Sequence, residues 1–174
     1  MNTFGGGVLF LDRCDINTDE IIPARYLTEM SKAALAPYLM EDFQHPGFEA
    51  TRDTAGKQAI VTRANFGCGS SREHAAWALE VNGIGLVLAE SFARIFRQNM
   101  FNCGLMAVEL PAETIAALFA RFSDRRTEVA VDMDDGRLDF SADGVHEQVH
   151  FALTEFDRLL VAAGGWIPFA DRRY

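Results

Sequence analysis

Short apolar runs alternate with amphipathic stretches through the middle of the chain. Four continuous apolar runs are typical of buried strands, at residues 8–11, 59–62, 86–89 and 106–110. Apolar residues at helical spacing predict three helices between and after these strands, over 71–82, over about 92–102 and from Pro111 onwards. This strand–helix alternation favours an α/β fold with a parallel core.

The spacing also predicts which helix faces are buried. In the 92–102 helix the inward face comprises Phe92, Ile95, Phe96 and Met100. After Pro111 the corresponding residues are Ile115, Leu118, Phe119 and Phe122. Gly83 and Gly104 stand where the first two helices should end.

The two ends of the chain have different patterns. Three short strands are predicted near the C-terminus, at 128–132, 137–140 and 145–151, with Asp-Gly turns at 135–136 and 143–144. A last helix should begin at Thr154, point Phe156, Leu159, Leu160 and Ala163 inward, and stop at Gly164-Gly165. Nearer the N-terminus, 15–26 is expected to be a loop with a brief extended piece. Residues 31–41 form a predicted helix that Pro37 must start, kink or divide, and a turn follows at 45–47.

Composition indicates a single folded domain over residues 1–174, since 49% of the residues are apolar and 24% are charged. The net charge of −9 disfavours nucleic acid and anionic membranes as general partners. No signal peptide or membrane-spanning stretch is expected. Three widely spaced cysteines without a Cys-x-x-Cys pair fit a reduced, cytoplasmic chain, and they exclude a self-contained four-cysteine metal site.

Residues 65–74, Asn-Phe-Gly-Cys-Gly-Ser-Ser-Arg-Glu-His, join a predicted buried strand to a predicted helix. The two glycines permit positive φ and a close approach of a ligand to the backbone. Ser70 and Glu73 have the spacing of a capping box, and the helix N-terminus behind them suits an anion. Arg72 can hold a carboxylate or phosphate with two hydrogen bonds. The alternative is an ordinary capped helix after a glycine turn. The segment lacks the Gly-Lys-Ser/Thr of a P-loop.

Three other candidates carry less weight. His-Glu-Gln-Val-His at 146–150 matches a zinc-hydrolase pattern, but the surrounding residues alternate like a strand, which holds the two histidines about 13 Å apart. Cys68 lies near a predicted helix N-terminus, where a thiol can be a nucleophile, although a small buried residue is the simpler interpretation. His74 is either a general acid or a buried hydrogen-bonding residue.

Residues 66–75 closely resemble the signature of the 3-isopropylmalate dehydratase small-subunit family. The related aconitases carry the same Gly-Ser-Ser-Arg-Glu-His core in a C-terminal swivelling domain. Two further blocks are similar to this family, at 17–27 and at 91–99 with 102–105, so the resemblance covers roughly 8–111. It implies an α/β swivelling domain of the β/β/α type, a partly open β-barrel with flanking helices.

The resemblance also implies an activity, the reversible dehydration of a hydroxy di- or tricarboxylic acid. The substrate it favours is the 3-isopropylmalate/2-isopropylmalate pair of leucine biosynthesis. A separate large subunit carries the [4Fe–4S] cluster in this family, so no metal site and no cofactor is expected on this chain. By the same resemblance Ser70 is the catalytic base, Ser71 and Arg72 contact substrate carboxylates, and Asp19 organises the carboxylate-binding side.

One segment departs from the family pattern. After the Tyr-Leu pair at 26–27, family members carry a loop that selects the substrate side group, and here Thr28 and Glu29 occupy it. The absence of an arginine there argues against a tricarboxylate. Lys32 stands near the place of a further aconitase arginine. The alternatives are a small subunit of a homoaconitase or of a methylmalate- or dimethylmalate-type hydratase, and, in another class, a non-catalytic anion-binding regulatory module.

Overall fold

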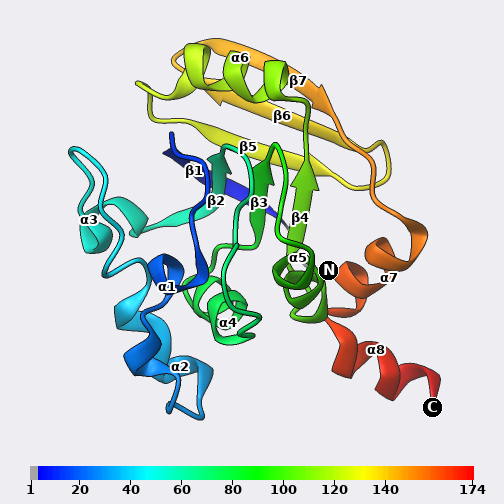
Figure 1. Cartoon of the computed structure of the whole chain (residues 1–174). Helices are drawn as coiled ribbons and strands as arrows, with labels where there is room; N and C mark the ends of the chain where they lie inside the picture. Colours follow the sequence, from blue (N-terminus) through cyan, green and yellow to red (C-terminus); the bar gives the residue numbers. More distant parts are fainter. Residues whose placement is uncertain (1–3) are drawn as a thin grey trace.

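The computed structural model describes residues 4–174. Seven strands form one sheet in the order β4-β3-β2-β1-β5-β6-β7 (Figure 1). The strands are β1 Gly5–Leu11, β2 Lys57–Thr62, β3 Leu86–Ala89, β4 Met106–Glu109, β5 Glu128–Asp132, β6 Arg137–Ala142 and β7 Val145–His150. The α-helices are α1 Thr18–Ile21, α2 Lys32–Leu35, α3 Ala50–Thr54, α4 His74–Val81, α5 Arg94–Asn102, α6 Ala112–Phe122, α7 Glu155–Ala163 and α8 Trp166–Arg173. Two 3₁₀ turns, η1 Ala24–Tyr26 and η2 Ala36–Tyr38, complete the list.

The sheet is parallel on one side of β1 and antiparallel on the other. β1 to β4 run parallel, and every residue of β3 is buried. Burial on both faces explains why the sequence of this half has continuous apolar runs. β5 to β7 form antiparallel hairpins that cross above the parallel strands, with α6 outside them (Figure 1). The curled sheet and its flanking helices confirm the α/β fold with a partly open barrel.

Two predictions about the segments near the parallel strands were wrong. The helix expected over 71–82 begins only at His74, because the preceding residues lie in irregular backbone. The 15–26 segment contains α1, which an unpredicted capping box between Asn17 and Glu20 starts. The prediction for the 31–41 segment was confirmed: α2 ends at Leu35 and the turn containing Pro37 follows as 3₁₀ helix, so Pro37 divides the helix.

The predicted apolar faces were right for α6 and partly wrong elsewhere. Ile115, Leu118, Phe119 and Phe122 of α6 are all buried, and the Phe122 ring packs 5.8 Å from Phe140 of β6. Ile95 of α5, by contrast, is 55% exposed.

In α7 two residues expected to face inward, Phe156 and Leu159, are 46% and 42% exposed. Phe156 packs against Phe169 of α8 instead, with ring centroids 5.8 Å apart. Helix α8 was not predicted, so the sequence pattern offered Phe156 no partner outside the main core.

The His-Glu-x-x-His pattern lies on strand β7, with both histidines exposed. A strand separates i and i+4 by about 13 Å, so the zinc-hydrolase interpretation lacks the helical geometry it needs. In residues 4–174 no helix has the length and hydropathy required to cross a bilayer.

Cys103, the residue that caps the end of α5, should make the fold sensitive to alkali. Burial raises the pKa of its thiol to about 12, from an ordinary value of 9.0. The unfolded chain loses this proton first, so the stability held below pH 9 falls as pH rises toward 12. We expect Cys103→Ala to shrink the drop in urea midpoint between about pH 8 and about pH 10. Cys14→Ala, at an exposed cysteine, is the control; an equal drop in all three proteins would contradict the assignment.

Candidate functional site

The glycine-rich segment before α4 is held in place by the segment that leads into α1. Gly67 N–H donates to the Ile16 carbonyl at 2.8 Å, and Thr18 N–H donates to the Cys68 carbonyl at 2.8 Å. The φ angle of +82° at Gly67 allows the chain to turn between these two bonds. Segments about fifty residues apart in the sequence are thereby joined side by side.

On its other side the same segment is fixed to the start of α5. Phe66 N–H donates to the Ser91 carbonyl at 3.1 Å, and Ala93 N–H donates to the Phe66 carbonyl at 3.0 Å. Further along, the Asn99 side-chain amide donates to the Ser71 carbonyl at 3.3 Å. The three similar blocks of sequence therefore meet at one place.

Two hydroxyl groups lie together at the end of this segment. Ser70 is exposed, and its Oγ lies 3.2 Å from Oγ1 of Thr18. Thr18 itself is only 1% exposed, so a rigid, buried hydroxyl holds the accessible one. Thr18 was not predicted as a site residue, although its place beside Asp19 in the block at 17–27 was a signal for it.

Arg72 and Asp19 form an ion pair between Nη1 and Oδ1, although 53 positions separate them. The Arg72 side chain is 25% exposed and the Asp19 side chain is 60% exposed. Among residues 4–174 the guanidinium makes no other hydrogen bond, so its remaining N–H groups can bind an anion. Ser70, Arg72 and Asp19 thus gather on one accessible edge.

The expected capping box between Ser70 and Glu73 is absent from this edge. Glu73 is the residue before α4 and makes no side-chain cap hydrogen bond, and Ser70 lies four residues before the helix. The hydroxyl of Ser70 is consequently not engaged by the helix backbone. An anion bound beside Ser70 would be stabilised mainly by the charge of Arg72, because α4 begins only at His74, four residues after Ser70.

The loop that contains Thr28 and Glu29 lies beside this edge. Thr28 and Met30 are exposed, whereas the Glu29 carbonyl accepts a hydrogen bond from Nε2 of His74 at 3.2 Å. His74 thus makes a hydrogen bond, although it is only partly buried. Lys32 pairs with Glu80 of α4, its Nζ lying 2.7 Å from the carboxylate.

Cys68 does not have the environment of a nucleophile. Its thiol is half-buried, and burial raises the pKa of that thiol, with the Asp15 carboxylate adding to the effect. The thiol therefore stays protonated near neutral pH. This agrees with the simpler interpretation of Cys68 as a small residue within the glycine turn.

Comparison with known proteins shows which family this chain resembles. The aconitase C-terminal domain family model matches residues 16–113, which contain all of the site described above. The 3-isopropylmalate dehydratase small subunit of Pseudoalteromonas translucida is 42% identical over 139 residues, 75% of this chain and 69% of that protein. The chain belongs to the family of 3-isopropylmalate dehydratase small subunits.

Other members of the family match over greater lengths. The small subunit of Chloroflexus aurantiacus is 36% identical over 173 residues, covering 94% of this chain and 85% of its own. A crystal structure of a 3-isopropylmalate dehydratase from Methanocaldococcus jannaschii superposes with a TM-score of 0.79 at 29% identity, over 99% of this chain and 95% of that one. The half-barrel with its flanking helices is thus a fold found in the family.

Proposed function

We propose that this chain is the small subunit of a two-chain hydro-lyase that interconverts 2- and 3-isopropylmalate by dehydration and rehydration. The observation that carries the proposal is the edge where the Ser70 hydroxyl and the Arg72–Asp19 pair meet. Family membership supports it, because the relatives are named 3-isopropylmalate dehydratase small subunits.

On this proposal Arg72 and Ser71 bind a substrate carboxylate. A guanidinium can hold a carboxylate with two parallel hydrogen bonds, and an adjacent hydroxyl supplies a third donor. Asp19 fixes the Arg72 side chain by pairing with Nη1 and leaves its other donors for the substrate.

Ser70 is the base that removes the proton from carbon. A serine hydroxyl is a weak base in water, and the positive charge of Arg72, two residues away, favours its alkoxide form. Closure against a second chain would exclude water and strengthen this effect. Thr18 orients Ser70 through the contact between their hydroxyl oxygens.

The [4Fe–4S] cluster of this enzyme class belongs on the large subunit. Cys14 is exposed, Cys68 half-buried and Cys103 buried, and among residues 4–174 no three His, Cys, Asp or Glu side chains converge as a metal site. The residues of this chain therefore do not fit the cluster. We assign this chain the carboxylate-binding and proton-transfer groups only.

The chain acts as one aconitase-type swivelling domain over residues 1–174, in the cytoplasm, where its three free cysteines stay reduced. Its step belongs to leucine biosynthesis, and Thr28 and Glu29 line the substrate side group. The position of Thr28, where an arginine would serve an additional carboxylate, favours a dicarboxylic acid.

The decisive experiment is reconstitution with the cognate large subunit. We expect turnover of 3-isopropylmalate only when both chains and an intact cluster are present, and faster turnover than of homoaconitate, citramalate or dimethylmalate. Faster turnover of one of those acids would mean that this acid, and not 3-isopropylmalate, is the substrate. Absence of turnover for every hydroxy acid, with the complex assembled and the cluster intact, would favour an anion-binding regulatory module.

A further inference from the structure

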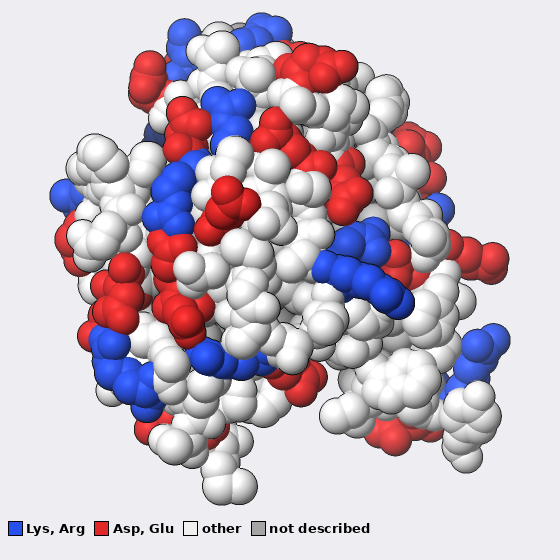
Figure 2. All heavy atoms as spheres, in the orientation of Figure 1, with Lys and Arg blue, Asp and Glu red and all other residues white. Residues whose placement is uncertain are grey.

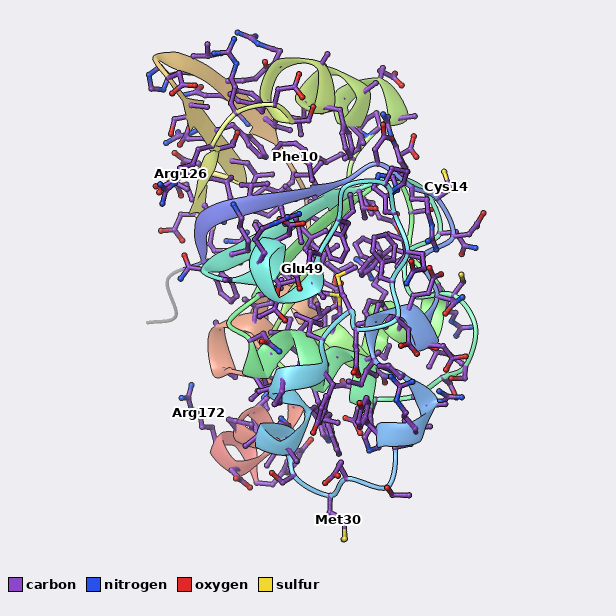
Figure 3. The ribbon with its side chains drawn as sticks, turned by 90° about the vertical axis from the view of Figure 1, so that its left-hand side faces the viewer. Phe10, Cys14, Met30, Glu49, Arg126 and Arg172 are labelled. Atoms are coloured by element: carbon purple, nitrogen blue, oxygen red, sulfur yellow. The ribbon has the colours of Figure 1, made fainter. Side chains whose placement is uncertain are left out.

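A cavity of about 640 Å³ opens where β1 separates from β5. β1 pairs with β5 only over Gly5–Gly7, after which Val8 N–H donates to the Thr127 carbonyl at 3.0 Å. Beyond Val8, among residues 4–174, no strand lies against this side of β1. The cavity fills the opening between β1, α3 and the segment after α6, on the face that carries Phe10 and Arg126 in Figure 3. Its volume is typical of small-molecule sites, and none of its lining residues belongs to the candidate site.

One wall of the cavity is apolar and held in place. The rings of Phe10 and Phe119 pack edge to face with centroids 5.4 Å apart. Phe48 packs in the same way on the buried ring of Phe43, with centroids 5.1 Å apart. Phe10 and Phe48 are only partly buried, so each ring keeps a surface open to the cavity. This wall is therefore ready to cover an apolar group.

The rim of the cavity carries more positive than negative charge. The lining side chains are basic at Arg52, Lys57, Arg125 and Arg126 and acidic at Asp12, Asp53 and Asp124. Two of these carboxylates are already paired, Asp12 with Arg63 and Asp53 with Arg52. Within residues 4–174 Lys57 and Arg126 form no ion pair, and Asp124 is the lining carboxylate that remains to oppose them.

These unpaired cations are not part of a broad basic surface. Acidic and basic side chains are interspersed over the face drawn in Figure 2. The whole chain carries a net charge of −9, which repels extended polyanions. The positive charge at the cavity therefore suits one small anion better than a nucleic acid.

Backbone groups complete the cavity. N–H groups two residues apart in a strand point to the same side. Val8 N–H points toward β5, so Phe10 N–H faces the opening that β5 has left. The segment that carries Arg126 is fixed by the buried Thr127, whose Oγ1 lies 3.0 Å from the Phe122 carbonyl oxygen and 3.1 Å from that of Arg125.

We propose that this cavity is a second binding site, for a small organic acid with a carboxylate on a short apolar body. Lys57 and Arg126 hold the carboxylate, with Phe10 N–H as a further donor. The apolar body lies against the rings of Phe10 and Phe48. The inference does not depend on the proposed function, because it uses none of the residues at the edge around Ser70.

The test is a titration of the full ¹⁵N-labelled chain with 4-methylpentanoate, followed by amide chemical shifts. We expect saturable shifts at Phe10, Phe48 and Lys57 with a Kd of about 1 mM. Acetate lacks the apolar body and 4-methylpentanamide lacks the charge, so each should bind at least about fivefold more weakly. Equal affinity for the acid and the amide, or no saturable shift at these residues up to about 50 mM, would overturn the proposal.

Charge-matched variants show whether the cavity itself binds the acid. Arg126→Gln and Lys57→Gln each remove one positive charge from the rim and should raise the Kd about fivefold. Arg172→Gln removes the same charge from α8, far from Arg126 in Figure 3, and should leave the Kd unchanged. Both arginines are exposed, so neither change should affect folding. An equal rise for Arg172→Gln would mean that net charge alone attracts the acid, and the assignment of the cavity would be wrong.

Discussion

Ser70→Ala should lower kcat of the reconstituted enzyme by about 10³-fold while the two subunits assemble normally. A positioned base contributes roughly 10² to 10⁴ in rate, and no other hydroxyl in this site combines the exposure of Ser70 with a buried partner. Ser70 is exposed and caps no helix, so its removal should leave the fold unchanged. Steady-state kinetics and size-exclusion chromatography of the complex measure the two quantities.

Two further variants make the result specific. Thr18→Val removes the hydroxyl that holds Ser70 and should lower kcat less, by about tenfold, with KM nearly unchanged. Ser123→Ala, at an exposed serine that ends α6, is the control for loss of a serine hydroxyl. Turnover by Ser70→Ala at the wild-type rate would show that Ser70 is not the base. Another group would then have to accept the proton from carbon.

The elements that could be predicted are those whose burial leaves a clear pattern of apolar residues in the sequence. The run at 86–89 is continuous and apolar because β3 is covered on both faces. The α6 face was predicted because one stripe of that helix is buried against the sheet. The Asp143-Gly144 turn could be predicted because both residues adopt positive φ, which few residue pairs tolerate.

The errors occurred where a partner distant in the sequence decides the outcome. Phe156 has the spacing of a core residue, but its partner is Phe169 on α8, a helix that was not predicted. Ile95 has the same helical spacing as Phe96 and Met100, yet only one flank of α5 meets the core. Periodicity identifies an apolar face but not how much of it a neighbouring element covers.

The candidate site likewise has residues that the sequence predicted and contacts that it did not. Ser70 and Arg72 were singled out by their residue types and by resemblance to a family. Asp19 came from the same resemblance, but its ion pair with Arg72 and the contact of the Thr18 hydroxyl with Ser70 could not be deduced, because 53 and 52 positions of sequence separate these residues. Only the folded chain shows that Thr18 is buried and therefore able to hold Ser70 in place.

The second large effect concerns the turn that carries this site. Gly67 has φ +82°, and a Cβ there would lie 2.2 Å from the Phe96 ring, a buried part of α5. Gly67→Ala therefore combines left-handed backbone strain of about 1 to 2 kcal/mol with overpacking of about 1 to 3 kcal/mol. We expect the free energy of unfolding to fall by about 3 to 4 kcal/mol in urea titrations.

Gly47→Ala separates the two contributions to this loss. Gly47 has a similar φ of +76°, but nothing lies within 4 Å of its added Cβ, so it should lose only about 1 to 2 kcal/mol. Equal losses at the two positions would mean that Phe96 moves aside without penalty. If Phe96 cannot move, the segment must shift instead, and Ser70 shifts with it. The fraction of Gly67→Ala that remains folded should then also show a reduced kcat, whereas Gly47→Ala keeps the wild-type value.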